Sequence, residues 1–117
     1  MKQSNYLRIN TPDFKYKIII SNSFVFEINE IYNYILWRLH SEINAKNFLE
    51  KIFSKFELLK FNPYIYQTLF YQENPDYKYR KIPINNFIII YSINEDKKIV
   101  NILHIFYAKS SFGYRLF

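Results

Sequence analysis

Apolar residues in the first half of the chain recur at helical spacing. Behind Ser21-Asn22-Ser23, a cluster of good helix N-caps, they follow at intervals of three or four, the period of one helix face. This first stripe is Phe24, Ile28, Ile31, Ile35 and Leu39. A second stripe begins behind the N-cap candidate Ser41 and comprises Ala45, Phe48, Leu49, Ile52, Phe56 and Leu59. Asn62-Pro63 ends it, so the pattern predicts two helices in an antiparallel hairpin.

The remaining apolar runs are typical of strands. KYKIIIS at 15–21 precedes the helices and predicts a short buried strand. Behind the helices come KYRKIPI (78–84), FIIIYSI (87–93) and IVNILHIFY (99–107), separated by tight turns. The last two are nearly all apolar and therefore central, whereas Pro83 cannot donate a ladder hydrogen bond and indicates an edge strand. The order β-α-α-β-β-β predicts an α+β fold, with a helical hairpin packed on a small, mostly antiparallel sheet.

Two stretches lack a clear period. Residues 1–14, which include Thr11-Pro12-Asp13, are interpreted as an N-terminal arm, and residues 15–117 as a single domain. Residues 62–77 are the least regular part of that domain. There the sequence predicts a short strand near 65–71 and a turn at Asn74-Pro75-Asp76.

Composition excludes several kinds of chemistry. The 117 residues contain no Cys, which removes disulfides, thiolate catalysis and Cys-based zinc sites. With two histidines and a single glycine, ordinary zinc sites and glycine-rich phosphate loops are not expected, so no metal or cofactor is predicted. No apolar run approaches the roughly 20 residues of a membrane span. The N-terminus shows no secretory signal either, so a cytoplasmic protein without membrane association is expected.

The chain is basic, with a formal net charge of +6 and a pI near 9.4. Part of the excess of Ile, Asn, Lys, Tyr and Phe is typical of AT-rich coding sequences, but such a bias need not unbalance charge. Seven cations follow Tyr77, against only Glu95 and Asp96, so the sheet half is the basic half. A basic small domain favours polyanions or acidic protein partners.

Several blocks in order resemble the RelE/ParE family of toxins over about 16–112. Residues 31–35 are similar to its "I-x-x-Y-I" first helix, and 45–49 with Ile52 and Leu59 to its second. The most specific block is 79–84 followed by 87–91, where the family has an Arg, a short turn and "Y-x-I-x-Y". Ile102, Ile105, Tyr107 and Lys109 resemble its last strand.

This resemblance implies the toxin of a type II toxin–antitoxin pair, in a hetero-oligomer with a cognate antitoxin. ParE-like members poison DNA gyrase and are not nucleases, whereas RelE-like members cut mRNA in the ribosomal A site. The chain looks closer to the ParE-like branch, and we expect growth inhibition by binding rather than catalysis. An mRNA interferase and a degenerate, non-toxic binding protein remain the alternatives. An acidic, partly disordered antitoxin tail would suit the basic half.

Arg80 is the leading site residue, because the matching Arg of RelE-like enzymes faces the phosphate. An Arg stays charged and donates in bidentate fashion, although Arg80 could instead support the sheet. In a nuclease, Arg80, Tyr107 and Lys109 would act together, the last two sharing a face where the last strand ends. The residues predicted to bind target or antitoxin are Lys78, Arg80, Lys81, Tyr107, Lys109 and Arg115.

The chain departs from its family at the end of the last strand. The Arg-Arg-Asp of many ParE-like members reads Lys109-Ser110-Ser111, and the His-Tyr pair of some RNA-cutting relatives is missing. His104 should face away from Tyr107 and be a core residue rather than a base. Glu27 and Glu30, one helical turn apart, are interpreted as a solvated face. Without a well-placed base, a binding role is favoured over nuclease chemistry.

Overall fold

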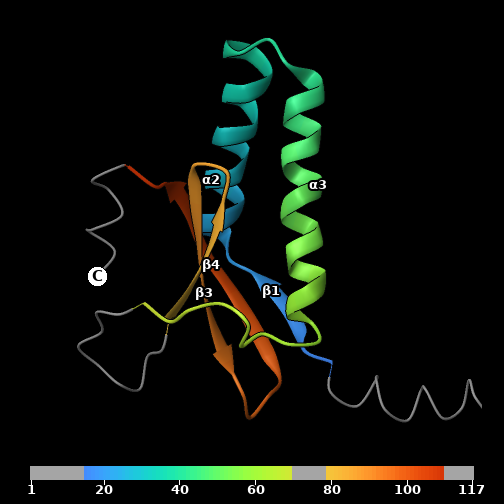
Figure 1. The fold of residues 1–117 in the computed structure, drawn as a ribbon, viewed down its shortest axis with the longest axis vertical. Helices are drawn as coiled ribbons and strands as arrows, with labels where there is room; N and C mark the ends of the chain where they lie inside the picture. The colour runs from blue at the N-terminus through green and yellow to red at the C-terminus, as the bar shows by residue number, and fades with distance from the viewer. Residues whose placement is uncertain (1–14, 70–78, 110–117) are drawn as a thin grey trace, which may run out of the picture.

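The computed structural model describes residues 15–69 and 79–109 (Figure 1). Its elements are β1 (Lys17–Ile20), α2 (Asn22–Asn33), the π-helical turn η2 (Tyr34–Arg38), α3 (Glu42–Leu59), β2 (Tyr79–Ile84), β3 (Phe87–Asn94) and β4 (Ile99–Tyr107). The predicted α+β class and element order are confirmed. The predicted arm 1–14 and the turn at 74–76 lie outside the described residues.

The four strands form one mixed sheet in the order β1-β4-β3-β2. β1 pairs in parallel with β4, and the other neighbours are antiparallel. The central places of β3 and β4 and the edge place of β2 are confirmed. The prediction of a buried first strand was wrong: β1 lies at the opposite edge, where Ile19 and Ile20 are about 40% exposed. The chain turns into α2 directly behind β1, and only Ile18 of its three isoleucines packs against the core.

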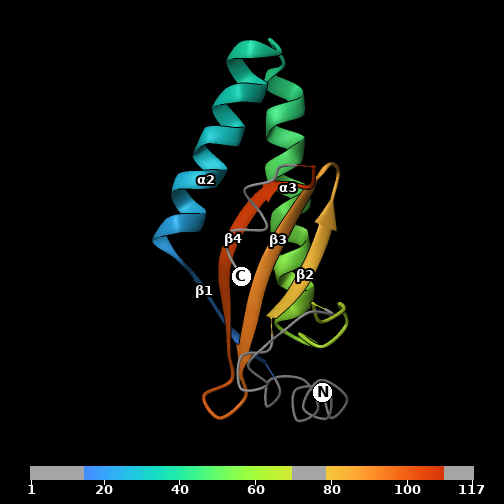
Figure 2. The ribbon, with the colours of Figure 1, turned by 90° about the vertical axis from the view of Figure 1, so that its left-hand side faces the viewer.

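Both helices cover one face of the sheet (Figure 2). Ser21 accepts a hydrogen bond from the Phe24 amide at 3.0 Å, and Ser41 one from the Asn44 amide at 3.2 Å, so both predicted N-caps are confirmed. The core between helices and sheet contains most of the predicted apolar stripes, without Leu39 and Leu49. Its buried members from the helices and the sheet are Phe24, Phe48, Ile52, Phe56, Leu59, Ile82, Ile84, Ile89, Tyr91, Val100, Ile102 and Ile105.

The first helix ends differently from its predicted course. The α-helical pattern stops at Asn33, and the Leu39 amide donates to the carbonyl of Tyr34, five residues earlier, at 3.3 Å. Ile35 is therefore the last residue of the stripe that packs on the core, and Leu39 is exposed. His40 then takes a left-handed backbone (φ 51°) that turns the chain into α3.

Candidate functional site

Arg80 lies on the helix-bearing face of β2, since strand alternation places it with the buried Ile82 and Ile84. Its side chain is already engaged there. Nη1 donates to the carbonyl of Tyr66 at 2.6 Å and, more weakly, to that of Tyr64 at 3.4 Å. The guanidinium carbon also lies 5.0 Å from the centre of the Tyr64 ring, a cation–π contact. Arg80 therefore holds the segment that follows α3 against the sheet.

Backbone hydrogen bonds hold the same segment to β2. The Lys81 amide donates to Gln67 at 3.1 Å, the Leu69 amide donates to Tyr79 at 2.8 Å, and Thr68 bridges to Arg80. This antiparallel pairing lies within the predicted strand near 65–71, of which residues 70 and 71 are outside the described residues. It covers part of the outer edge of β2, which would otherwise leave backbone groups unpaired.

Tyr91 anchors the beginning of the segment from within the core. Its side chain is fully buried on β3, and its hydroxyl donates to the carbonyl of Pro63 at 2.6 Å. Burial raises the pKa of the Tyr91 hydroxyl well above its ordinary value, so it remains a donor over the accessible pH range. Tyr91 is also the cross-strand neighbour of Arg80. The two side chains bond successive carbonyls of the segment, Tyr91 that of Pro63 and Arg80 those of Tyr64 and Tyr66.

A polar cluster ties the start of β1 to the β3–β4 turn. Glu95 accepts hydrogen bonds from the hydroxyls of Tyr16 (2.8 Å) and Tyr64 (2.6 Å) and forms an ion pair with Lys98. The Lys98 hydrogen bond, followed by those of the two tyrosines, lowers the pKa of Glu95 to about 2. The hydrogen bond to Glu95 in turn raises the pKa of Tyr64 to about 12. Lys98 is thus engaged with Glu95 inside the predicted basic half.

Tyr107 and Lys109 lie at the other end of the sheet. The Tyr107 ring meets that of Phe87 edge-on, with ring centres 5.7 Å apart, and remains 45% exposed. Lys109 is exposed in the turn that follows. Tyr107 pairs with Phe87, four residues along β3 from Tyr91, the partner of Arg80. At about 3.3 Å per residue and about 4.8 Å between strands, the Cα atoms of Arg80 and Tyr107 lie roughly 16 Å apart.

The other predicted binding cations are placed as follows. Lys81 is on the helix-free face of β2, opposite to Arg80, as strand alternation predicts. Lys78 and Arg115 lie outside the described residues. The structure therefore groups Tyr107 with Lys109 at one end of the sheet and keeps Arg80 apart from them. The binding role of all six residues stays a prediction.

Glu27 and His104 form a pair that the sequence did not predict. His104 Nδ1 lies 2.9 Å from one carboxylate oxygen of Glu27, and the other oxygen accepts the Ile105 amide at 2.9 Å. The expectation that Glu27 lies on a solvated face was wrong, because it caps the edge of β4 beyond the end of β1. The Ser21 hydroxyl caps the same edge by donating to Leu103 at 2.7 Å.

A β-bulge explains why this edge needs side-chain partners. Ile90 pairs with His104 whereas Tyr91 pairs with Ile102, so Leu103 is an extra residue in β4. β1 ends opposite Ile102 and leaves the next part of β4 without a strand beside it. An unpaired buried amide is costly, and Glu27 supplies the missing acceptor. The closest sequence signal is the position of Glu27, directly before the core residue Ile28.

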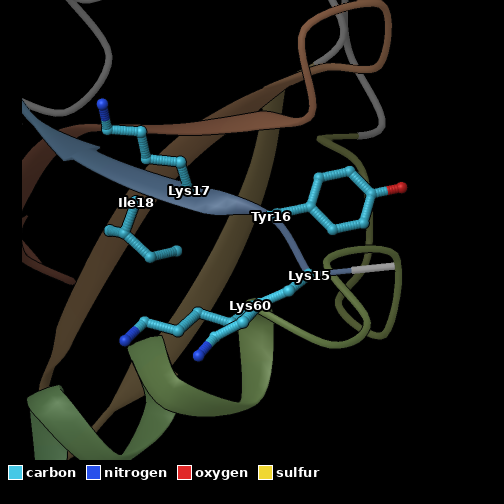
Figure 3. Close-up of a pocket in the computed structure, with 5 residues that line it drawn as sticks. All are labelled: Lys15, Tyr16, Lys17, Ile18 and Lys60. Carbon is cyan, nitrogen blue, oxygen red and sulfur yellow. The ribbon is translucent and has the colours of Figure 1, made fainter. Parts of the chain in front are cut away.

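A shallow pocket of about 470 Å³ lies beside β1 and is lined by Lys15, Tyr16, Lys17, Ile18 and Lys60 (Figure 3). The side chains of Lys15 and Lys60 run in the same direction, whereas the Lys17 amine lies on the other side of the strand. Lys60 forms an ion pair with Glu57 at 2.7 Å, and this bond lowers the pKa of Glu57. The pocket is basic but partly neutralised. Residues 15–69 and 79–109 contain no group of three potential metal ligands.

The arrangement of the helical hairpin on this sheet is also found in solved structures. Five solved chains match the structure. One is the crystal structure of the archaeal RelE-RelB complex from Pyrococcus horikoshii OT3, with a TM-score of 0.55 and 16% sequence identity, over 83% of this chain and 99% of that chain. The molecule therefore shares the fold of this RelE chain.

The family follows from the sequence match. Residues 18–112 match the model of the ParE toxin of the type II toxin–antitoxin system, parDE, and the chain belongs to this family. It is accordingly a toxin-type component whose partner is an antitoxin. No curated protein matches it by sequence. No helix among the described residues is long and apolar enough to cross a membrane.

Proposed function

We propose that this protein arrests growth by binding an essential target such as DNA gyrase, and that a cognate antitoxin neutralises it. The family match over 18–112 is the observation that carries the proposal. This match supports a ParE-like toxin that acts by binding through its surface. A ribosome-dependent mRNA interferase is the competing function within the superfamily.

The contacts of Arg80 support binding over phosphate chemistry. Its Nη1 donates to two backbone carbonyls and its guanidinium carbon lies 5.0 Å from the centre of the Tyr64 ring, so the side chain has a structural role beside the segment behind α3. Groups that stabilise one scissile phosphate must approach it within hydrogen-bond distance. The Cα atoms of Arg80 and Tyr107 lie roughly 16 Å apart by strand spacing, so both side chains would have to extend toward a phosphate between them, whereas Nη1 of Arg80 is bonded to the Tyr66 carbonyl.

The antitoxin is proposed to cover the basic half of the molecule. Lys81 lies half-buried on the helix-free face, and Lys109 is exposed at the end of β4. An acidic antitoxin segment would be attracted to these cations and to Lys78 and Arg115. Charge reversal at Lys109 should therefore weaken the complex, and the loss should shrink as the salt concentration rises.

Controlled induction in a bacterial host tests the proposed target. We expect growth arrest without new mRNA 5′ ends inside translated regions, and inhibition of DNA supercoiling by purified gyrase. Abundant cuts in phase with codons would overturn the proposal in favour of an mRNA interferase. Normal growth, together with uninhibited gyrase, would indicate the degenerate, non-toxic alternative. Co-expression of the antitoxin should restore growth.

The variants for this experiment should spare the fold. Arg80→Ala is unsuitable on its own, because it removes a structural contact and would lower either activity by destabilising the segment behind α3. Lys109→Ala and Tyr107→Phe change exposed predicted site residues with little effect on packing, since the ring of Tyr107 is retained against Phe87. Loss of toxicity in Lys109→Ala at unchanged stability would assign the end of β4 to target binding.

A further inference from the structure

β1 leaves one edge of the sheet open. It is the first strand in the order β1-β4-β3-β2, and in the part of the chain that the structure describes no strand lies on its other side. The amides of Lys17 and Ser21 both donate toward β4, each at 2.9 Å. In a parallel strand pair, alternate residues direct their backbone groups to the same neighbour. Ile18 and Ile20 therefore direct their amides and carbonyls outward, away from β4.

The outward groups begin beyond a contact with α3. The Tyr16 amide, which also points away from β4, donates to the carbonyl of Lys60 at 2.7 Å and brings the end of α3 beside the start of β1. Farther along the strand, the described residues place no strand beside the two donors and two acceptors of Ile18 and Ile20. Ile20 is 39% exposed. A free row of backbone donors and acceptors is a template for an added strand.

Lysine side chains flank this edge on both faces of the sheet. Lys15 and Lys60 run in the same direction beside the strand, whereas the Lys17 amine lies on the other side (Figure 3). All three line the open pocket of about 470 Å³, which leaves room beside the strand. Glu57 pairs with Lys60 at 2.7 Å, so a net positive charge remains. The edge therefore attracts an acidic strand and repels the β1 edge of a second copy, which carries the same lysines.

We propose that an extended, acidic segment of the antitoxin adds to the sheet along the free edge of β1. This inference rests on the antitoxin partnership of the proposed function. It gives that partner a contact at the edge opposite to β2, the strand that carries Lys81. Main-chain hydrogen bonds to Ile18 and Ile20 hold the segment, and carboxylates on its two faces meet the lysines on both sides of the edge. Charge selects the partner.

A synthetic peptide of alternating valine and glutamate is the probe for strand addition. The full chain, made by cell-free synthesis with isotope labels for NMR, is titrated with this peptide. We expect the amide resonances of Ile18 and Ile20 to shift saturably and their hydrogen exchange to slow, because both amides gain acceptors. The Ile19 amide, which points toward β4, should change less. An absence of saturable shifts up to about 1 mM peptide would overturn the proposal.

Two further peptides separate hydrogen bonding from charge. The same sequence methylated at every backbone nitrogen keeps its carboxylates but cannot donate to the strand, and it should bind at least about tenfold more weakly. A peptide of alternating valine and lysine should also bind at least about tenfold more weakly, because its charge matches that of the edge. Equal binding of the methylated peptide would mean attraction by charge alone and would refute strand addition.

Ile20 offers a matched pair of variants. Its amide points away from β4, so Ile20→Pro removes an outward donor without removing a ladder hydrogen bond. Ile20→Ala shortens the same half-exposed side chain and keeps the donor. Ile20→Pro should weaken binding of the valine–glutamate peptide about tenfold, whereas Ile20→Ala should stay within about threefold of the native chain. Native affinity in the proline variant would contradict the proposal.

Far-ultraviolet circular dichroism checks that both variants fold, and the methylated peptide tests the native chain without any substitution. Growth arrest, inhibition of gyrase and rescue by the antitoxin are measured without these peptides. A failure of strand addition at β1 is therefore distinguished from a failure of the proposed function.

Discussion

Replacing Arg80 by alanine separates a structural role from a catalytic one. The change removes a charged hydrogen bond to Tyr66 at 2.6 Å and the contact with the Tyr64 ring. Hydrogen bonds to charged groups contribute about 1.5–3 kcal/mol, toward the lower end here because the site is partly exposed. An exposed cation–π contact adds about 0.5–1 kcal/mol. We therefore expect a loss of about 2 kcal/mol in the free energy of unfolding.

Thermal unfolding of the isolated chain, without any target, measures this loss. For a domain of this size an unfolding entropy of about 0.25 kcal/mol/K converts the loss into a fall in Tm of about 8 °C. Arg80→Lys retains the charge but not the planar fork, and it should fall between the variant and the native chain. Lys81→Ala, on the opposite face of the same strand, is the control and should stay within about 0.5 kcal/mol.

One outcome refutes the reasoning. If the free energy of unfolding of Arg80→Ala lies within about 0.5 kcal/mol of that of the native chain, the carbonyl contacts contribute little to stability and the guanidinium is available to a phosphate. In that case the experiment on mRNA 5′ ends should be read with Arg80 as a candidate contact to RNA. A clear loss of stability instead assigns Arg80 to the architecture behind α3.

Three further perturbations test other contacts. Glu27→Ala leaves the Ile105 amide without its acceptor and should cost about 1–3 kcal/mol in denaturant unfolding; an unchanged midpoint would mean that water replaces the carboxylate. Tyr91→Phe leaves the buried carbonyl of Pro63 without its donor and should lower the free energy of unfolding by a similar 1–3 kcal/mol, roughly. An almost unchanged free energy of unfolding would mean that the carbonyl finds another donor. The free energy of unfolding should fall as pH drops from about 4.5 toward 2, because the hydrogen bond from Lys98, more than any other contact, lowers the pKa of Glu95 in the folded state. In thermal melts recorded over this pH range, Glu95→Gln should show a smaller decrease in stability.

Much of the fold could be predicted from the local pattern of residues along the sequence. The helix starts at Ser21 and Ser41, the bounds of β4 and the edge place of β2 followed from capping, periodicity and one proline, because each depends on neighbours in the chain. β1 was misjudged for a reason of the same kind. An apolar run of three residues looks alike at the centre and at the edge of a sheet, and only the pairing decides which it is.

The candidate site was less accessible, because its contacts join residues far apart in the chain. The amino-acid sequence identified Arg80, Tyr107 and Lys109 as chemically capable and placed the chain among toxins. It could not show that Nη1 of Arg80 donates to the carbonyls of Tyr64 and Tyr66, since that depends on how the segment behind α3 folds back. The capping of β4 by Glu27 depends in the same way on the register shift at Leu103. Residue type and periodicity can be read from the sequence. Which hydrogen bond a polar side chain makes depends on which backbone groups, distant in the sequence, lack a partner in the folded molecule.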